Sequence, residues 1–422
     1  MTAYDVIVIG GGPAGLAAAV SAYGEGAKVL LIEREAKLGG ILKQCVHDGF
    51  GLIEFKEKLT GPEYAGRFIE QAAATGVETR LLTFVTKIEK IADGFVISLV
   101  DRSGVSSVAA KSIVLATGCR ERTARQVFIG GTRPAGIFTA GTTQHFVNLR
   151  GKMPVKKCVI LGSGDIGLIM ARRLSLEGAT VEGVYEVKST PSGLTRNIHQ
   201  CLYDFNIPLH LSTTVTRCFG NDRLTAVEVA AVDEKMRPIK GTERIIECDA
   251  LILSVGLIPE NELAESIDVA LDNRTRGPIC DQNCMTSVPG VFSAGNALHV
   301  HDLVDYVSDC SRIAGKSAAR FAKTQSKPER KLTQAAFDKN FLYVVPQTVD
   351  LNSDLSAVSV YFRSGYDMKA RFVVRVNGKE VFSKRYSVLK PPEMEKVVLN
   401  LAEALKDGGK PEFALEDVTK LG

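Results

Sequence analysis

A short run of β-branched residues opens the hydrophobic pattern of the chain. Residues 6–9 (VIVI) contain no polar position, which is typical of a strand buried on both faces of a parallel sheet. Residues 16–23 then form a mainly apolar helical segment, and residues 29–32 form a second apolar run. The pattern predicts a strand, a helix and a second strand in succession, which is the βαβ arrangement of a parallel sheet.

Three glycines lie between the first predicted strand and the helix. Gly10, Gly12 and Gly15 have the spacing GxGxxG: the first makes a tight turn, the second leaves room for a pyrophosphate, and the third lets the helix pack on the strand. Glu33 follows the second strand, where a carboxylate can bind the hydroxyls of an adenosine ribose. A glycine-rich turn without a ligand is the alternative, but the complete succession favours a dinucleotide site.

The same unit occurs again in the middle of the chain. Gly162, Gly164 and Gly167 repeat the spacing after the apolar residues 158–161. A helix and a second strand are again expected to follow. The repeat predicts a second dinucleotide-binding unit.

The acidic residue of this second unit is displaced by one position. Counting the same offset from the glycines leads to Tyr185, and Glu186 comes next. A carboxylate facing the ribose favours NAD over NADP because it repels a 2′-phosphate. Lys188 or Arg196 could still accept such a phosphate, so both cofactors stay open at this point.

The last part of the chain has a different pattern. A charged, proline-containing stretch at residues 322–331 indicates a linker, and residues 331–422 alternate between apolar and polar positions as strands do. Asn377 and Gly378 between two alternating runs predict a type I′ hairpin. We expect a small β-sandwich-like domain, and for its role both packing against the rest of the chain and docking of a partner subunit stay open.

Composition narrows the class of protein. The chain has 422 residues, 45% hydrophobic and 24% charged, with a net charge of +4 and interleaved signs, so nothing indicates a nucleic-acid partner. The chain begins almost at once with a strand rather than a secretory signal, and no apolar run approaches a membrane span. We therefore expect a cytoplasmic protein.

The nine cysteines give no metal or disulfide signature. No CxxC occurs, and Cys280 with Cys284 forms a lone CxxxC, which is a weak metal signal. We predict reduced thiols, several of them packed as small hydrophobic residues, and no metal site.

Three further motifs extend the pattern into a family resemblance. They are IVLATGCRER (113–122), LILSVGLIPENEL (251–263) and TSVPGVFSAGNA (286–297). With the two glycine turns, they resemble the two-dinucleotide-binding-domain flavoproteins of the pyridine nucleotide–disulfide oxidoreductase superfamily, over residues 1 to about 325. The family usually has Gly-Asp where this chain has Gly295 and Asn296.

The resemblance implies an α/β fold with two Rossmann-like, three-layer domains, the second inserted in the first. The expected domains are an FAD domain at 1–120 and 286–328, an NAD(P) domain at 121–285, and the C-terminal β domain at 331–422. For FAD, the residues implied are Gly10, Gly12, Pro13, Ala14, Gly15, Glu33, Arg34, Gly40, Val85, Ala116, Thr117, Gly118, Gly295 and Asn296. For NAD(P), they are Gly162, Gly164, Asp165, Ile166, Gly167, Glu186, Val255 and Gly256.

The resemblance also implies that a helix at about 302–323 points its N-terminus at the flavin pyrimidine ring, where its dipole would stabilise negative charge on reduced flavin. His299 and His301 would then lie near the isoalloxazine, with His301 as a candidate catalytic residue. A role in capping the start of the helix is the alternative.

Most members of the superfamily pass electrons through a cysteine pair. The position after the second strand holds only Cys45, and the thioredoxin reductase position, residues 140–143, reads Ala-Gly-Thr-Thr. Cys45 remains a candidate single catalytic thiol, and we expect His47, Lys43 and Lys37 to lower its pKa. The alternative is that the stretch GGILKQCVHDGFG (39–51) is a cover for the flavin.

The stretch RPAGIFTAGTTQHFVN (133–148) resembles flavoprotein subunits of opine oxidase, hydrogen cyanide synthase and sarcosine oxidase, and other stretches resemble a flavoprotein associated with a glycerol-3-phosphate dehydrogenase-type partner. This implies an FAD-dependent NAD(P)H oxidoreductase, with NAD(H) favoured, that exchanges electrons with a dehydrogenase or iron–sulfur subunit; homo-oligomers stay open. The rivals are a disulfide or persulfide reductase using Cys45 and a nucleotide-binding subunit without catalysis.

Overall fold

The computed structural model describes residues 2–324 and 329–418 and divides the chain into two compact units. The first unit combines Met1–Cys119 with Pro259–Gly422, and the second is Arg120–Ile258. The second unit is thus an insertion in the first. The predicted linker falls partly on residues 325–328, which lie outside the described residues.

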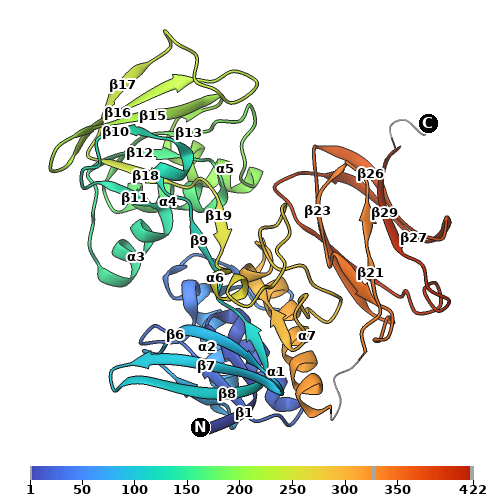
Figure 1. Ribbon diagram of the computed structural model, residues 1–422. Coiled ribbons are helices and arrows are strands. Elements are labelled where there is room, and N and C mark those ends of the chain that lie inside the picture. Colours follow the sequence, from blue (N-terminus) through green and yellow to red (C-terminus); the bar gives the residue numbers. More distant parts are fainter. Residues whose placement is uncertain (1, 325–328, 419–422) are drawn as a thin grey trace. The chain divides into compact units, whose positions relative to one another are not determined.

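The first unit is built on a seven-stranded sheet in the order β5-β2-β1-β8-β7-β6, with β20 paired to β8 (Figure 1). The expected βαβ unit is present, and the buried second strand has the predicted bounds. The elements are β1 (Thr2–Ile9), α1 (Pro13–Gly24), β2 (Val29–Ile32), α2 (Gly61–Ala73), β5 (Glu78–Arg80), β6 (Phe84–Ile91), β7 (Gly94–Asp101), β8 (Gly104–Leu115), α6 (Glu262–Glu265), β20 (Val291–Ser293) and α7 (Val304–Lys323). Short pieces complete the unit: β3 (Asp48–Phe50), β4 (Leu59–Thr60) and the 3₁₀ turns Gly40–Gln44 and Gly295–Ala297.

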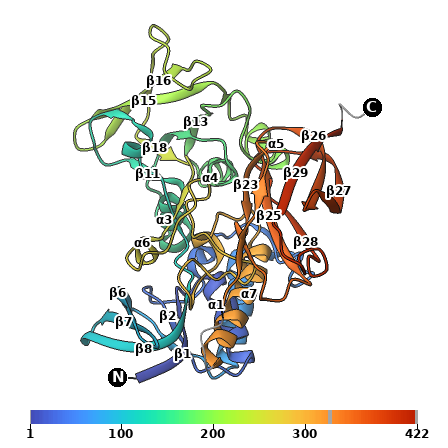
Figure 2. The ribbon, with the colours of Figure 1, turned by 45° about the vertical axis from the view of Figure 1, so that its right-hand side comes forward.

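Helices α1 and α7 lie side by side over one face of this sheet (Figures 1 and 2). Their close approach depends on small residues, because a Cβ on Gly315 would lie 2.1 Å from the carbonyl oxygen of Ala18. Val6 and Val8 of β1 pack into the same core. The expected helix at 302–323 is therefore confirmed, with its first residue at Val304.

The second unit is also α/β. A parallel sheet in the order β11-β18-β12-β13-β14 is covered on one face by helices and on the other by the sheet β10-β15-β16-β17. Its elements are η2 (Ala124–Val127), β10 (Gly130–Gly131), β11 (Ile137–Thr139), α3 (Ala140–Arg150), β12 (Lys157–Leu161), α4 (Asp165–Leu176), β13 (Thr180–Tyr185), α5 (Thr195–Cys201), η3 (Tyr203–Phe205), β14 (Leu209–His210), β15 (Thr213–Gly220), β16 (Leu224–Ala231), β17 (Arg244–Glu247) and β18 (Ala250–Leu253). Two short strands, β9 (Cys119–Glu121) and β19 (Leu257–Pro259), pair where the chain enters and leaves the unit.

The predicted domain boundary at residue 285 is not the one that the structure has. Residues from Pro259 onward group with the first unit. Ala264, Ile267 and Val269 are buried against the sheet of that unit, and Asn261 Nδ2 donates to the carbonyl oxygen of Ala297 at 2.9 Å. Packing of this short segment therefore places the boundary near Ile258.

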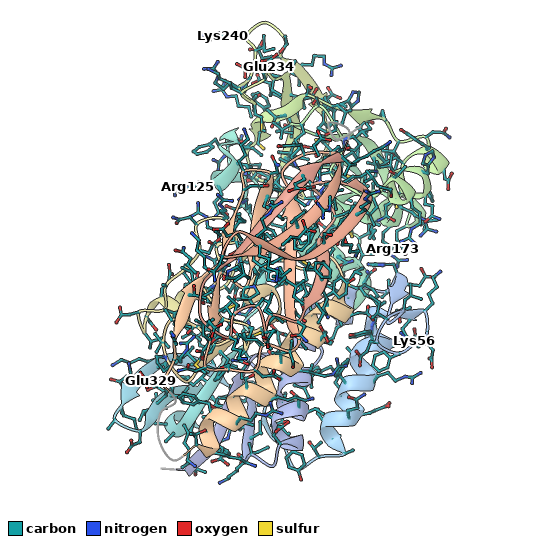
Figure 3. All side chains as sticks on the ribbon, turned by 90° about the vertical axis from the view of Figure 1, so that its right-hand side faces the viewer. Lys56, Arg125, Arg173, Glu234, Lys240 and Glu329 are labelled. Atoms are coloured by element: carbon teal, nitrogen blue, oxygen red, sulfur yellow. The ribbon has the colours of Figure 1, made fainter. Side chains whose placement is uncertain are left out.

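The C-terminal segment forms two facing sheets, β22-β29-β26-β27 and β23-β25-β28, around a shared apolar core. Glu329, where its described part begins, is labelled in Figure 3. Asn377 (φ 51°) and Gly378 (φ 77°) link β26 and β27, which confirms the predicted hairpin. The strands are β21 (Leu332–Gln334), β22 (Ala336–Phe337), β23 (Phe341–Val345), β24 (Thr348–Asp350), β25 (Val358–Ser364), β26 (Met368–Val376), β27 (Lys379–Leu389), β28 (Glu395–Leu399) and β29 (Pro411–Asp417).

This sandwich packs against the rest of the first unit. Gln282 Nε2 donates to the carbonyl oxygen of Asp350 at 2.9 Å, and the amide of Asp350 donates to Gln282 Oε1 at the same distance. Arg363 of β25 forms an ion pair with Asp302, just before α7. Of the two roles that the sequence left open, packing is the one that these contacts support.

Candidate cofactor-binding sites

The first glycine turn is too tight for any other residue. Gly10 has φ +110°, and a Cβ there would lie 2.3 Å from the carbonyl oxygen of Ala116. A Cβ on Gly15 would lie 1.7 Å from the carbonyl oxygen of Gly10. The glycines therefore let α1 begin directly above the end of β1, as the sequence predicts.

The N-terminus of α1 is open toward a ligand. Gly12 is its N-cap, Pro13 occupies the first turn, and among the described residues no side chain caps the helix. A helix N-terminus with uncapped N–H groups and its positive dipole end suits a pyrophosphate. The glycine turn and the helix N-terminus together form a nucleotide cradle. Gly12 has no Cβ to obstruct it, so the cradle fits the pyrophosphate of the dinucleotide that the sequence predicts.

Glu33 is fixed at the end of β2. Its side chain is only 6% exposed, and its carboxylate accepts the N–H of Gly11 and the N–H of Glu35, both at 2.7 Å. The two hydrogen bonds hold the carboxylate beside the glycine turn. This is the place from which it would face the ribose of a bound dinucleotide.

The other predicted FAD residues are spread around this turn. Gly40 has φ +55°, and a Cβ there would lie 2.9 Å from the Cα of Gly12. Thr117 Oγ1 donates to the carbonyl oxygen of Glu260 at 2.6 Å. Arg34 is largely exposed and lies 3.5 Å from the carboxylate of Glu260. Val85 is a buried core residue of β6, so its part in cofactor binding remains a prediction. Ala14 lies in the first turn of α1, the carbonyl oxygen of Ala116 lies beside Gly10, and the carbonyl oxygen of Gly118 accepts the N–H of Glu260 at 2.9 Å.

Gly295 and Asn296 lie close to the same helix. Gly295 has φ +62°, and a Cβ there would lie 2.6 Å from the Cβ of Ala14. The Asn296 amide donates to Cys119 Sγ at 3.5 Å, and its Oδ1 accepts the N–H of His301 at 3.0 Å. The asparagine therefore holds the chain that leads into α7.

The segment that contains Cys45 is tied to α7 by a buried carboxylate. Asp305, in the first turn of α7, accepts the N–H groups of Gly51 (3.3 Å), Ile53 (3.2 Å) and Glu54 (2.8 Å). Asp305 has no counterpart among the residues predicted from the sequence. A single aspartate in a helix carries no pattern that would have identified it.

Cys45 differs from the expectation. Its Sγ donates to the carbonyl oxygen of Ile41 at 3.4 Å, and burial raises the pKa of the thiol to about 11. Lys43 instead donates to the carbonyl oxygen of Lys37 at 2.8 Å, and the ring of His47 packs on Phe50 at 5.0 Å. The prediction that these cations lower the pKa of Cys45 is therefore wrong, because desolvation decides its value.

His299 and His301 lie directly before α7, where the sequence places them. They are 1% and 8% exposed, and their rings stack with centroids 3.9 Å apart. Tyr361 of the sandwich lies 5.3 Å from His299 and 5.6 Å from His301. Burial lowers the pKa of His299 well below its usual value, so this ring is neutral at pH 7.

The second glycine turn repeats the geometry of the first. A Cβ on Gly162 (φ +102°) would lie 2.0 Å from the carbonyl oxygen of Ser254, and one on Gly167 would lie 2.5 Å from that of Gly162. Gly164 caps α4 without a side-chain hydrogen bond. Here too the open helix N-terminus fits a dinucleotide pyrophosphate.

A bulge explains the displaced acidic residue. The register between β12 and β13 shifts between Cys158 and Val159, so that one extra residue is absorbed in β13. Leu161 is then paired with Tyr185, and the N–H of Gly162 donates to the carbonyl oxygen of Tyr185 at 2.7 Å. Glu186 therefore follows its strand directly, as Glu33 follows β2.

The carboxylate of Glu186 is held like that of Glu33. It is 4% exposed and accepts the N–H (3.0 Å) and the hydroxyl (2.6 Å) of Ser163, and the N–H of Lys188 (3.0 Å). Ser163, between the first two glycines, was not among the predicted residues. Its hydroxyl also accepts the N–H of Ser192 at 2.9 Å, which fixes the loop after Glu186.

Asp165, in the first turn of α4, holds the same loop through the N–H of Leu194 (2.9 Å) and the amide of Asn197 (2.7 Å). Ile166 is 38% exposed beside it. Gly256 (φ +99°) follows Val255 at the end of β18 and accepts the N–H of Arg122 at 3.0 Å. Residues 140–143, where thioredoxin reductases have a dithiol, form the first turn of α3.

A family model and several known proteins match this chain. The family model described as pyridine nucleotide-disulphide oxidoreductase matches residues 4–333. Hydrogen cyanide synthase subunit HcnB of Pseudomonas aeruginosa is 26% identical over 74% of this chain and 68% of its own length. An opine oxidase subunit of Agrobacterium tumefaciens is 24% identical over 75% of this chain and 64% of its own length.

Solved structures agree on the fold. Thioredoxin reductase from T. acidophilum superposes with a TM-score of 0.62 at 24% identity, covering 77% of this chain and 100% of that one. Within the described residues, no helix is both long and apolar enough to cross a membrane.

Proposed function

The chain belongs to the pyridine nucleotide–disulphide oxidoreductase family, whose members are FAD-dependent oxidoreductases, and from this premise we propose that it passes electrons between a nicotinamide dinucleotide, FAD and a second protein. FAD binds at the turn of Gly10 to Gly15, and NAD(H) binds at the turn of Gly162 to Gly167. Bound FAD supplies the two-electron chemistry. The chain itself positions the nucleotides and shields them from water.

The observation that supports this proposal most is the repetition of one geometry. In each unit a buried glutamate, Glu33 or Glu186, follows its strand and accepts an N–H from the glycine turn. Both nucleotide-binding turns are intact. This favours an enzyme that transfers electrons between two bound nucleotides over a subunit that binds a nucleotide only for structural reasons.

The choice of NAD(H) over NADP(H) is part of the proposal. The Glu186 carboxylate is buried and accepts three hydrogen bonds, which fix its position. A 2′-phosphate of NADP(H) would lie against this carboxylate and would be repelled by its negative charge. Lys188 contributes its backbone N–H to this arrangement.

A protein partner is proposed as the further acceptor. The relatives reported above are named as subunits of hydrogen cyanide synthase and opine oxidase. This chain has no cysteine at residues 140–143, and Cys45 carries a raised pKa. Both points favour electron transfer from the reduced flavin to an acceptor without the cysteines that the family usually uses.

The test is an anaerobic titration of the purified yellow holoprotein with NADH and with NADPH. Loss of the oxidised-flavin absorbance on addition of NADH is the expected result, since hydride transfer from the nicotinamide reduces the flavin. A flavin that stays oxidised with both nucleotides would favour the non-catalytic subunit. Reoxidation of the reduced flavin by an added disulfide or persulfide that is lost in Cys45→Ser would favour the single-cysteine reductase.

A further inference from the structure

Two thiols far apart in the sequence meet beside α7. Cys284 Sγ and Cys310 Sγ are 3.6 Å apart, and the side chains are 6% and 1% exposed. An S–S bond measures about 2.05 Å, so the sulfur atoms would have to approach by about 1.5 Å, which small side-chain rotations supply. The pair is therefore close to the geometry of a disulfide.

Cys284 is held in place by a buried ion pair. Its backbone is in the left-handed region (φ 60°), and its N–H donates to the carbonyl oxygen of Asp281 at 2.9 Å. The Asp281 carboxylate also accepts the N–H of Met285 at 3.1 Å and lies 2.8 Å from Arg330, with side chains 0% and 8% exposed. A buried pair of this kind fixes the turn, because loss of either partner leaves a buried charge.

Cys310 is placed close to the first nucleotide cradle. It lies three residues after Val307 and so shares that face of α7. The Cγ1 of Val307 is 3.2 Å from the position that a Cβ on Gly295 would take, and Ala14 of α1 touches the same position. The thiol pair is therefore about one helical turn from the chain that lines the FAD site.

His301 supplies a proton acceptor next to this pair. Its Nδ1 is 2.8 Å from the carbonyl oxygen of His299, which assigns the ring proton to Nδ1. Its Nε2 is buried, and within the described parts of the chain it has no hydrogen-bond partner. A ring nitrogen that carries no proton can accept a proton from a neighbouring thiol.

The two thiols differ in acidity. The hydrogen bond between the two thiols lowers the pKa of Cys310, whereas the same hydrogen bond and burial raise the pKa of Cys284. Cys310 is thus the more acidic thiol of the pair, and it is the one that loses its proton first when a disulfide forms.

We propose that Cys284 and Cys310 form a redox-active dithiol that exchanges two electrons with the FAD of the first unit. On oxidation the S–H bonds of both cysteines break and the S–S bond forms. Two electrons and one proton pass to the oxidised flavin, and the second proton passes to His301 Nε2. This inference rests on the proposed function, because the flavin is the oxidant.

Because both thiols are buried, the redox partner of the dithiol has to lie inside the protein. With side chains only 6% and 1% exposed, neither sulfur is accessible to a soluble disulfide. The sandwich contributes to this burial through Tyr361, whose hydroxyl donates to Asp309 at 3.3 Å, next to Cys310 in the chain. The pair therefore acts as an internal two-electron store beside the flavin and not as a site for external thiols.

The sequence offers a direct readout. No Lys or Arg lies between Arg276 and Arg312, so trypsin releases Cys280, Cys284 and Cys310 in one peptide, 277–312. The holoprotein is reduced anaerobically with NADH or reoxidised with air, then denatured in acid, alkylated and digested. We expect three alkyl groups on this peptide after reduction and a single one, on Cys280, after reoxidation.

Variants make the result specific. Cys280→Ser removes the neighbouring buried thiol and should give two alkyl groups after reduction and none after reoxidation. Cys284→Ser and Cys310→Ser should each give two in both states, and should halve the electrons that the holoprotein takes up from dithionite. Three alkyl groups on the reoxidised wild-type peptide, from a flavin that NADH bleaches normally, would overturn the dithiol and leave the proposed function standing.

Discussion

The carboxylate of Asp305 accepts the backbone N–H of Glu54 at 2.8 Å, which joins the first turn of α7 to the segment after Cys45. The same carboxylate accepts two more N–H groups of this segment. The stretch that begins at Gly39 is therefore fixed as a cover over the first glycine turn. Asp305 also places a carboxylate in the first turn of α7, at the positive end of the helix dipole.

Asp305→Ala should release this cover. Three N–H groups would lose their acceptor, and only the hydrogen bond of Gly51 is fully buried, so the cost is about 1–3 kcal/mol for that group and less for the two part-buried ones. Native-state hydrogen exchange of residues 51–54 should accelerate at least about tenfold, with faster loss of FAD. Asp309→Asn, which removes a carboxylate that contacts Lys396 of the sandwich, is the control. Unchanged protection of residues 51–54 in Asp305→Ala would refute the role of Asp305.

Glu186→Gln should shift the nucleotide preference. The amide keeps the size of the side chain and removes the charge that repels a 2′-phosphate, so kcat/KM for NADPH relative to NADH should rise about tenfold, or about 1.4 kcal/mol. Glu182→Gln makes the same charge change at the bulge, where Glu182 pairs with Lys157 at 3.1 Å, and should leave the ratio as it is. An equal shift in both variants would mean that Glu186 does not face the ribose.

Much of this architecture could be predicted from local sequence. The glycine turns, the strand 29–32 and the hairpin at Asn377 depend on neighbouring residues, so their patterns are readable. The position of Glu186 needed the bulge in β13, which depends on pairing with β12. The boundary near Ile258 depends on how a short apolar segment packs, and that is a tertiary effect.

The chemistry near α7 could not be read from the sequence. Cys284 and Cys310 are 26 positions apart and match no redox motif. Burial of His299 depends on the sandwich, whose contacts with it appear in no local pattern. The cationic neighbours of Cys45 in the sequence suggested a low pKa for its thiol. Burial raises that pKa instead, and burial cannot be seen in the sequence.

Cys45 should react slowly with alkylating agents near neutral pH. Because its pKa is raised to about 11, the thiolate fraction should rise about tenfold per pH unit through the range 7–9 without levelling off. The measurement is the rate of iodoacetamide labelling of the Cys45 peptide in the native holoprotein, with free cysteine as the reference. A rate that reaches a plateau below pH 8 would show an activated thiolate and revive the single-cysteine reductase.

His299 should stay neutral well below pH 6.5. Its pKa is lowered in the folded protein, so the stability it contributes is present above pH 6.5 and is lost as the pH falls below that value, where the unfolded chain takes up a proton first. NMR of the six ¹³C-labelled histidines should show one ring that does not titrate, absent in His299→Phe. The exposed His199 provides the control, His199→Phe. Titration of all six rings near pH 6.5 would contradict the burial argument.

The most direct test of the central claim is stopped-flow reduction of the flavin by NADH in the Cys45→Ser holoprotein, compared with wild type. If a nicotinamide reduces FAD without the family's usual cysteines, flavin absorbance should fall at a saturable rate equal to that of wild type. That rate should slow with NADH deuterated at the transferred position, since hydride transfer is then the step observed. A flavin that NADH does not bleach, or that loses its reduction only in Cys45→Ser, would contradict the account.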